Sequence, residues 1–415
     1  MSQSYNVAID ARWITATPSG IAVYTRELMR RLPLCEPGWR WNFIFRDKTL
    51  QEAVERDCAF PASVKTAWHT VPYGPLSPRS QMRMPDFLRA MKCDLFHSTS
   101  FMVPFFAFGS VKTLLGSAPP QDRGCGKCIA TIHDAIPLIV GNYAPKSATS
   151  RMRRLYRMSL KSAIRSSAFT ITGSNASRRD IVSALGLSSK EADSLRTIYD
   201  GVSDRFSPAG ADESGPSRGF PSASGRKADV VLYVGRLDPY KNVPMLVDAF
   251  AILLHETGAP LHLLVIGPDD PRYPEARNHA EYRGIRENVS FIRDATDEEL
   301  VAAYRNASLL VNPSRYEGFG LPMLEAMKSG TPVICADGGS QPEIAGGAAR
   351  VVPVDDINAL VRAMREILFD KGARAELAGK GIRRAADFSW DKTAAETIAL
   401  YREALGAPPA GNGAS

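Results

Sequence analysis

The chain has 415 residues, of which 44% are hydrophobic and 23% are charged. This balance is typical of a folded globular protein and excludes the disordered and fibrous classes. Lys and Arg outnumber Asp and Glu by 51 to 44, a formal net charge of +7. The excess favours an anionic partner without choosing between nucleic acid, a membrane surface and a phosphorylated small molecule. The length predicts two domains, although one large barrel would also fit.

Short apolar runs alternate with longer helical patterns in the first half of the chain. The runs lie at residues 6–10, 41–45, 94–97, 129–134 and 169–172. This alternation predicts a parallel sheet covered by helices. We therefore expect residues 1–206 to form a first Rossmann-like domain of the α/β class.

The next segment, residues 207–229, is dominated by Gly, Pro, Ala and Ser and is predicted to be an interdomain linker. Beyond it, apolar runs return at residues 230–235, 261–267, 289–292, 309–312, 332–335 and 350–354. They are continuously apolar, as strands covered on both faces should be. We expect a second doubly wound domain over 230–405, a cleft between the domains and a disordered tail over 406–415.

The six cysteines are spread along the chain, which argues against a disulfide framework and fits a reducing compartment. No apolar run approaches the roughly 18 residues of a membrane-spanning helix, and the N-terminus lacks a leader pattern. We therefore expect a cytoplasmic protein. Cys125 and Cys128 form the only close pair; a surface loop with two thiols is favoured over a zinc or redox site.

The most informative segment, residues 314–327 (SRYEGFGLPMLEAM), follows an apolar run and opens a helix. Its two glycines leave the first backbone N–H groups of the helix exposed, and Pro322 supports a helix start there. Glu317 in the loop and Glu325 on the helix then flank an anion site. Carboxylates accept hydrogen bonds from hydroxyls, so the arrangement suits a sugar nucleotide. A plain strand-turn-helix connection with solvated acids is the alternative.

Three further segments stand where strands end or helices begin. Arg236 and Lys241, in GRLDPYKN after the first strand of the second domain, suit a diphosphate, or are simply solvated. His133, beside Asp134, either orients a reacting hydroxyl or is a satisfied half-buried histidine. Gly20 would let a ligand approach the backbone at a helix N-terminus.

Together these segments resemble the retaining glycosyltransferases of family 4 (glycosyl transferases group 1), which have the GT-B fold of two Rossmann-like domains. The resemblance covers nearly the whole chain. Its most specific element is the Glu-x7-Glu motif from Glu317 to Glu325, supported by GRLDPYKN and by the strand that ends near His133.

The resemblance implies a set of site residues. Arg236 and Lys241 would bind the donor's diphosphate and stabilise the leaving group, and Glu317 would contact the donor sugar's hydroxyls. Glu325 would hold the nucleotide ribose, and His133 would hydrogen-bond the donor sugar.

Backbone contacts complete the implied set: Phe319, Gly320 and Leu321 would supply N–H groups to the sugar or phosphate, and Gly20 would line the phosphate and acceptor side. The chain has Ser19-Gly20 where family members usually have paired glycines, which puts a contact from Ser19 in doubt. No Asp-x-Asp triplet is present, so the site is expected to need no metal or other cofactor. Retention by front-face transfer is implied by the family alone.

Basic residues follow one another between residues 146 and 179 with no Asp or Glu among them: Lys146, Arg151, Arg153, Arg154, Arg157, Lys161, Arg165, Arg178 and Arg179. Five of them step by three or four residues and would form one stripe on a helix. Such a stripe predicts peripheral contact with an anionic membrane surface, the inner face of the plasma membrane, and suits a polyprenyl-diphosphate-linked glycan acceptor. A solvated helix face is the alternative.

The leading hypothesis is therefore transfer of a hexose from a nucleotide-diphosphate sugar to a cell-surface glycan. The run at residues 131–138 (TIHDAIPL) looks like bacterial mannosyltransferases of lipopolysaccharide or exopolysaccharide synthesis, which makes GDP-mannose the first choice among donors. Other sugars on UDP or dTDP stay open. A nucleotide-sugar 2-epimerase and a non-catalytic carbohydrate-binding protein are the competing hypotheses, and no motif supports nucleic-acid binding.

Overall fold

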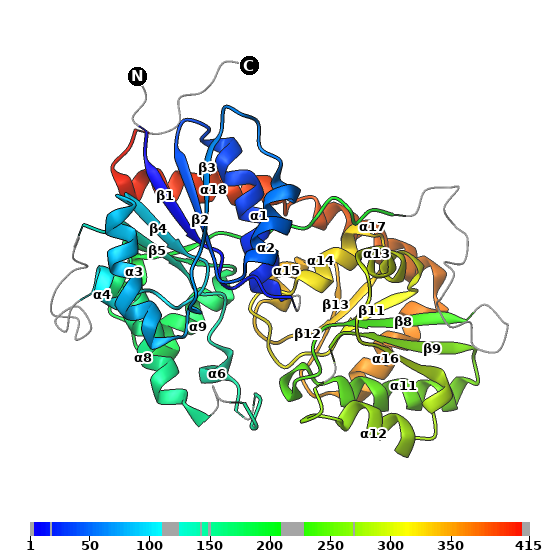
Figure 1. Ribbon diagram of the computed structural model, residues 1–415. Coiled ribbons are helices and arrows are strands. Elements are labelled where there is room, and N and C mark those ends of the chain that lie inside the picture. Colours follow the sequence, from blue (N-terminus) through cyan, green and yellow to red (C-terminus); the bar gives the residue numbers. More distant parts are fainter. Residues whose placement is uncertain are drawn as a thin grey trace. The chain divides into compact units, whose positions relative to one another are not determined.

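The computed structural model describes residues 4–16, 19–109, 124–141, 143–147, 151–208, 228–268 and 270–408. The chain divides into two compact units, each built on one parallel sheet (Figure 1). The first unit comprises Met1–Ala135, Met152–Gly201 and Trp390–Ser415, and the second comprises Ile136–Arg151 and Val202–Ser389. The predicted α/β class with two Rossmann-like doubly wound domains is confirmed.

The first unit is organised around a seven-stranded sheet in the order β3-β2-β1-β4-β5-β6-β7. Its strands are β1 Asn6–Asp10, β2 Arg40–Phe45, β3 Lys65–Thr70, β4 Leu95–Ser98, β5 Lys127–Thr131, β6 Phe169–Thr172 and β7 Leu195–Thr197. Its helices are α1 Gly20–Cys35, α2 Lys48–Cys58, α3 Pro78–Ala90, α4 Phe105–Phe108, α8 Arg153–Ser166, α9 Asn175–Leu185, α10 Ser189–Asp193 and α18 Trp390–Leu405.

Hydrophobic burial explains why these segments form strands and helices. In β1 the side chains of Val7, Ala8 and Ile9 are all fully buried, as expected for a central parallel strand with helices on both faces. Helix α1 begins at Gly20 because the Ser19 hydroxyl caps it, accepting a hydrogen bond from Ala22 N at 3.2 Å.

All five apolar runs predicted in the first half correspond to strands of this sheet. The two strands that the sequence did not predict are β3 and β7, which form its edges. Edge strand β3 has mostly half-buried side chains, and β7 has three residues. Neither carries the continuous apolar run that marks a central strand.

The second unit has a six-stranded sheet in the order β10-β9-β8-β11-β12-β13. Its strands, all predicted, are β8 Asp229–Val234, β9 Leu261–Ile266, β10 Val289–Ile292, β11 Leu309–Asn312, β12 Val333–Ala336 and β13 Arg350–Val352. Its helices are α6 Ile136–Ile139, α11 Val243–Thr257, α12 Glu275–Tyr282, α13 Asp297–Asn306, α14 Leu321–Lys328, α15 Gln341–Ala345, α16 Ile357–Phe369 and α17 Lys371–Ala385, with 3-10 turns η2 Pro239–Lys241 and η3 Arg286–Asn288. Apolar residues of its strands and of α11 and α16 share one core.

In both sheets, whose strands are all parallel, the order in which successive strands are added reverses between two neighbouring strands, a position called the strand reversal below. In the first unit, successive strands run outward from β1 on one side and from β4 on the other, and in the second unit they do so from β8 and β11. Loops that leave the carboxyl ends of two such strands diverge and make room for a ligand. The loops after β1 and β4, and those after β8 and β11, are therefore the candidate ligand positions.

The domain assignment differs from the predicted boundaries at the C-terminus. Helix α18 was placed with residues 230–405 but belongs to the first unit. It packs against α1, the Tyr401 hydroxyl lies 2.5 Å from His97 Nδ1, and the Thr393 hydroxyl donates to the Tyr199 carbonyl at 2.7 Å. These buried contacts join residues that are far apart in the sequence, and they place α18 in the first unit although it follows the second unit along the chain.

The crossing between the units also falls earlier than predicted, after Gly201, and the segment Ile136–Arg151 belongs to the second unit. Phe206, assigned to the first domain, is buried against Tyr304 with ring centroids 5.4 Å apart. Ser207, the first residue of the predicted linker, is also held to the second unit, because Arg305 donates to its carbonyl at 2.9 Å. Most of that linker (209–227) and most of the predicted tail (409–415) lie outside the described residues.

The cysteine pair is buried, so the predicted surface loop is wrong. Cys125 and Cys128 are at most 2% exposed, because Cys128 belongs to central strand β5, and burial raises the pKa of its thiol to about 12. In the described part of the chain no three His, Cys, Asp or Glu side chains gather at metal-binding distance. A search of the same residues finds no helix that is long and apolar enough to cross a membrane.

Candidate functional site

The two most informative sequence segments meet at the strand reversal of the second sheet. GRLDPYKN follows β8, and SRYEGFG follows β11, its neighbour in the sheet. Lys241 at the end of η2 points to Glu317: its Nζ lies 2.7 Å from Oε1 and 2.8 Å from Oε2. The two side chains are 16% and 10% exposed. The structure thus brings together an ammonium and a carboxylate that are 76 residues apart in the sequence.

Hydrogen bonds hold this pair in one position. Ser314 Oγ donates to Glu317 Oε1 at 2.6 Å. Two donors therefore converge on Oε1, whereas Lys241 is the single donor to Oε2, so acceptor capacity remains there. Burial opposes the charge on Lys241, but the neighbouring Glu317 carboxylate outweighs it and raises the pKa of Lys241. The ammonium uses two of its three protons on Glu317 and keeps one for a further anion.

Backbone contacts join the two loops as well. Arg315 N donates to the Tyr240 carbonyl at 2.8 Å, and the Arg315 guanidinium donates to the Pro239 carbonyl at 3.1 Å. The same guanidinium forms an ion pair with Asp355, which in turn accepts a hydrogen bond from Asn242 Nδ2 at 3.0 Å. The loops after β8 and β11 are therefore one preorganised structure rather than two independent turns.

A third segment, residues 338–341 (GGSQ) after β12, clamps the Glu317 loop, and the sequence analysis missed it. The single proton of Ser340 Oγ is shared between the carbonyls of Glu317 and Phe319, which lie 3.0 and 2.9 Å away. Gln341 Nε2 donates to the Ser314 carbonyl at 2.8 Å. A Cβ on Gly339 would lie 2.4 Å from the Glu317 carbonyl oxygen, so glycine is required for this close approach. A Gly-Gly pair at a strand's carboxyl end was the signal that could have revealed it.

Helix α14 begins directly after the loop, as the position of Pro322 predicted. Its N-cap, Gly320, is left-handed with φ 103° and no side chain caps the helix. The backbone N–H groups of Gly320 and Leu321 donate to no acceptor within the described residues. Unpaired N–H groups at a helix N-terminus favour an anion. Phe319 is buried beside Phe388, with ring centroids 5.9 Å apart.

Glu325 lies one turn into α14 and faces Tyr304 of α13. The buried Tyr304 hydroxyl donates to Oε2 at 2.7 Å, and Oε1 has no partner among the described side chains. Burial raises the pKa of Glu325, which the hydrogen bond from Tyr304 partly offsets. The two carboxylates of the Glu-x7-Glu motif thus differ: one pairs with a cation and the other with a neutral hydroxyl.

Arg236 occupies the outer part of the loop after β8. It is exposed, and its Nε donates to the buried Asp238 carboxylate at 2.7 Å. The guanidinium keeps further N–H donors for a ligand because it has five in total. Arg236 and Lys241 therefore present cationic donors from the same loop, as predicted.

In the first unit, His133 follows β5, the neighbour of β4 in the sheet. Its Nε2 lies 3.0 Å from the Thr99 carbonyl oxygen, in the loop after β4. A carbonyl can only accept, so Nε2 carries the proton and Nδ1 is an acceptor. Burial lowers the pKa of His133 to about 4, and Tyr24 packs against its ring at 5.0 Å. His133 is half-buried and satisfied at one nitrogen, while Nδ1 has no partner among the described residues.

Gly20 is the first residue of α1, in the loop after β1. It is exposed, and a Cβ placed on it would meet nothing within 4 Å. No protein contact therefore requires glycine at this position. Its neighbours Thr17 and Pro18 lie outside the described residues.

The predicted basic stripe is shorter than expected. Lys146 and Arg151 belong to the second unit, whereas α8 belongs to the first. Arg165 forms an ion pair with Glu191 at 2.6 Å, and Arg178 donates to the carbonyls of Leu195 and Ala192. The other basic residues of α8 lie at its N-terminal and middle turns, and all but the half-buried Lys161 are exposed: Arg153, Arg154, Arg157, which donates to the Ala184 carbonyl, and Lys161.

Comparison with known proteins decides the family. Residues 18–206 match the family described as Glycosyltransferase Family 4, and residues 220–384 match the family described as Glycosyl transferases group 1. The chain is 30% identical to O-antigen chain mannosyltransferase B of Escherichia coli over 281 residues. The aligned stretch covers 66% of this chain and 70% of that protein. The chain belongs to glycosyltransferase family 4. It is an enzyme of the glycosyltransferase class.

Other relatives of this family 4 glycosyltransferase differ in their described activities. D-inositol 3-phosphate glycosyltransferase of Corynebacterium glutamicum (strain R) is 33% identical over 233 residues, 52% of this chain and 56% of that protein. HepE of Anabaena, solved in complex with UDP and glucose, superposes with a TM-score of 0.69 over 96% of this chain and all of that chain, at 16% identity. The superposition confirms the GT-B fold.

Proposed function

We propose that the chain is a retaining transferase that moves a hexose, with mannose from GDP-mannose as the first choice, to a lipid-linked glycan acceptor in cell-surface polysaccharide synthesis. The observation that carries the donor assignment is the Lys241–Glu317 pair at the strand reversal of the second sheet. Ligands of doubly wound sheets bind at this position. A cation there suits a diphosphate, and a carboxylate suits sugar hydroxyls.

Each side chain of the pair has a role that follows from its unused hydrogen-bonding capacity. The third proton of the Lys241 ammonium binds the donor's diphosphate and stabilises the charge that grows on the leaving group. Such preorganised electrostatic stabilisation is usually the largest single contribution to transfer of this kind. The acceptor capacity left on Glu317 Oε2 binds a hydroxyl of the donor sugar.

The remaining donor contacts surround this pair. Arg236 adds bidentate donors to the diphosphate. Gly320 and Leu321 supply backbone N–H groups at the start of α14, Phe319 bounds the same turn, and Glu325 Oε1 accepts from the ribose. Because these cationic and N–H groups supply the charge that a phosphate requires, we propose that donor binding needs no metal ion.

The first unit handles the acceptor in this proposal. His133 Nδ1 is a neutral hydrogen-bond acceptor and suits a hydroxyl of the donor sugar, because a pKa near 4 leaves the ring uncharged at neutral pH. Gly20, with open space above it, leaves room for a phosphate or an acceptor group at the N-terminus of α1. The basic cluster on α8 supports peripheral contact with an anionic membrane surface, where a lipid-linked acceptor would be found.

The choice of mannose rests on likeness alone. The run TIHDAIPL resembles bacterial mannosyltransferases, and a relative that shares 30% identity is described as an O-antigen chain mannosyltransferase. The 33% identical relative is described as a D-inositol 3-phosphate glycosyltransferase, so relatives at this distance carry different descriptions.

A thermal-shift panel tests the donor assignment. GDP, UDP, dTDP and ADP are compared with their sugars, and a ligand at one hundred times its dissociation constant should stabilise the protein by about 2.7 kcal/mol. We expect GDP-mannose to give the largest shift. A larger shift with another nucleotide sugar would overturn the assignment of mannose and leave the assignment as a nucleotide-sugar transferase standing.

Hydrolysis of the preferred donor without acceptor tests the site. Glu317→Ala and Lys241→Ala should each abolish it. Matched controls are Lys380→Ala and Glu376→Ala, which break an exposed Lys–Glu pair of 2.6 Å on α17 and should keep full turnover. Full turnover in both site variants would show that the donor binds elsewhere.

A further inference from the structure

Large apolar side chains are exposed together on one face of the first unit. They belong to α3 and the residues before it, to α4 and to the start of α8, which contact one another in the order α3, α4, α8. Each is at least half exposed: Leu76, Met82, Phe106, Met152, Leu155 and Met158. Isolated apolar residues on a surface need no explanation, but a group on adjoining helices marks an interaction site.

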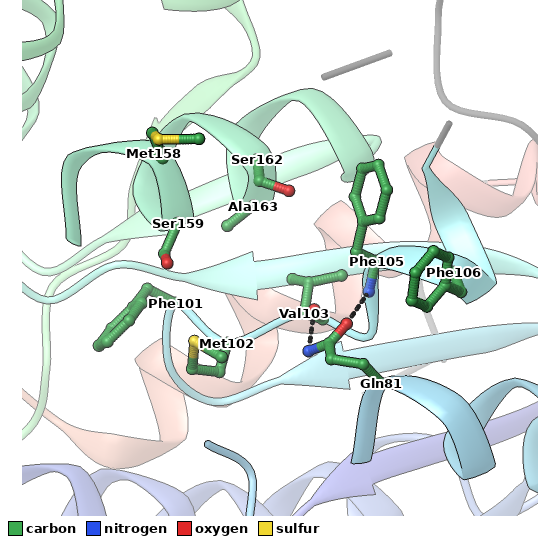
Figure 2. Close-up of a pocket in the computed structure, with 10 residues that line it drawn as sticks. All are labelled: Gln81, Phe101, Met102, Val103, Phe105, Phe106, Met158, Ser159, Ser162 and Ala163. Carbon is green, nitrogen blue, oxygen red and sulfur yellow. Dashed lines mark hydrogen bonds between the residues drawn. The ribbon is translucent and has the colours of Figure 1, made fainter. Parts of the chain in front are cut away.

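A cavity that is open to solvent lies on this face, lined in part by Phe106 and Met158. Its volume is about 290 Å³, at the low end of ligand pockets, and Figure 2 shows side chains from α8, α4 and the loop after β4 around it. Most of its lining is apolar: Phe101, Met102, Val103, Phe105, Phe106 and Met158. A hydrocarbon is the chemistry that such a lining accepts.

The polar groups of the lining are mostly engaged. The Gln81 side chain donates to the Val103 carbonyl at 3.3 Å and accepts from Phe105 N at 2.6 Å, as the dashed lines in Figure 2 show. Ser159 Oγ donates to the Leu155 carbonyl at 3.0 Å. A polar ligand would find few free partners here, whereas an apolar chain leaves these bonds intact.

Cations stand beside the cavity on the same helix. Arg154 and Lys161 are two turns apart on α8, with Met158 between them in the neighbouring row. Like Arg157, they form no ion pair with any residue that the structure describes, although the Arg157 guanidinium also donates to the Ala184 carbonyl. The face thus combines an apolar cavity with uncompensated positive charge, which is complementary to an amphiphile that has an anionic head.

The cavity also adjoins the loop that carries His133. Phe101 stands two residues after Thr99, whose carbonyl oxygen binds His133. The Phe101 ring packs edge-on against Tyr156 of α8 at 5.1 Å, and the Tyr156 hydroxyl donates to the Asp134 carbonyl at 3.4 Å. A ligand in the cavity is therefore separated from the loop of His133 by one layer of side chains.

We propose that this cavity holds the hydrocarbon chain of a prenyl phosphate-linked acceptor, with Arg154, Arg157 and Lys161 binding its phosphate. The inference rests on the lipid-linked acceptor of the proposed function and specifies which surface of the first unit binds the lipid. It assigns the cavity to the hydrocarbon chain of the acceptor. Binding of bulk membrane lipid to the same face is the competing outcome of the test.

Direct binding of farnesyl phosphate, a short prenyl phosphate, tests the proposal without any sugar nucleotide. We expect saturable binding of farnesyl phosphate and much weaker binding of farnesol or inorganic phosphate. Ser162→Phe, which fills the cavity, and the double variant Arg154→Gln/Lys161→Gln should each weaken it at least about tenfold, since cavity and charge both contribute. Arg56→Gln/Lys190→Gln removes the same charge from other exposed positions and should bind like the unmodified chain.

Two measurements keep the test decisive if Ser162→Phe folds poorly. A photoreactive farnesyl phosphate analogue should label peptides 101–106 or 152–163 of the unmodified chain; labelling only outside these peptides overturns the proposal. Vesicles of phosphatidylcholine with phosphatidylglycerol form the second arm. If these vesicles bind the chain while farnesyl phosphate does not, the face recognises bulk anionic lipid and the cavity assignment is wrong.

The failure of this proposal is distinguishable from the failure of the proposed function. If Ser162→Phe still gives a thermal shift with GDP-mannose and binds farnesyl phosphate unchanged, the assignment of the cavity is wrong and the assignment of the donor site stands. Cavity-dependent binding of farnesyl phosphate with no response to any nucleotide sugar supports the cavity and overturns the donor site.

Discussion

Lys241 Nζ lies within 2.8 Å of both carboxylate oxygens of Glu317, so one ammonium holds the carboxylate symmetrically. The two residues come from loops that follow neighbouring parallel strands, β8 and β11. Because both side chains are largely withdrawn from water, removal of either partner leaves a charge that is poorly solvated. The pair therefore serves the fold and the proposed donor site together.

This dual role predicts a difference between single and double substitutions. Lys241→Met and Glu317→Gln should each destabilise the protein by about 1 to 3 kcal/mol, because each leaves one partner unpaired. The double variant should lose less than the sum of the two, as a thermal-unfolding cycle would show. All three variants should lose donor hydrolysis by about 100-fold or more. Strictly additive stabilities would mean that the pair is not coupled in solution.

Gly339 provides a steric test of the Glu317 loop. Gly339→Ala should reduce donor hydrolysis strongly, because its φ is +66° and the new Cβ would lie 2.4 Å from the Glu317 carbonyl oxygen. Gly347→Ala is the matched control: its φ is +80°, but nothing lies within 4 Å of the added Cβ. Backbone strain should cost each variant about 1 kcal/mol of stability, and the contact with the Glu317 backbone should add a further loss in Gly339→Ala alone. Equal hydrolysis by the two variants would contradict a positioning role for residues 338–341.

Tyr304→Phe should distinguish the role of Glu325 from that of Glu317, the other carboxylate of the Glu-x7-Glu motif. The change removes the hydrogen bond that lowers the pKa of Glu325, so that already raised pKa should rise further. The folded protein then resists ionisation of Glu325, and the loss of stability, about 2 kcal/mol, should be larger at pH 8 than at pH 5. Nucleotide affinity should fall by up to about tenfold. Tyr282→Phe, at an 86% exposed position, should change neither.

The burial of Asp200 should make the stability of the protein depend on pH. Asp200 follows β7, is 5% exposed, and its Oδ1 has no hydrogen-bond partner in the described structure. Burial raises its pKa to about 7. The folded chain therefore keeps a proton that the unfolded chain releases above about pH 4, and stability falls as pH rises between these values.

Asp200→Asn should remove this dependence. Near pH 4 the variant and the unmodified chain should unfold at similar temperatures, and at pH 8 the variant should be more stable by about 2 to 4 kcal/mol. Thermal unfolding followed at several pH values provides the measurement. Parallel profiles for the two proteins would mean that Asp200 titrates normally.

Much of the candidate site could be predicted because its residues lie in two short segments with local signals. Glycines before a helix, a proline in its first turn and basic residues after an apolar run are all readable along the chain. Ser340 and Gln341 carry no such signal, since their role depends on which carbonyls they meet. Tyr304 resembles any buried aromatic residue of a helix until Glu325 is placed opposite its hydroxyl.

The sequence by itself determined the α/β class, the central strands and the loops that carry the candidate chemistry, because apolar runs and turn residues act over a few positions. Tertiary structure alone decided which loops meet. It placed β8 beside β11, moved α18 into the first unit, ended the basic stripe at the ion pair of Arg165 with Glu191, and set the cavity beside α8. These outcomes depend on strand order and on packing between residues far apart in the chain, where the free energy comes from burial that no local pattern records.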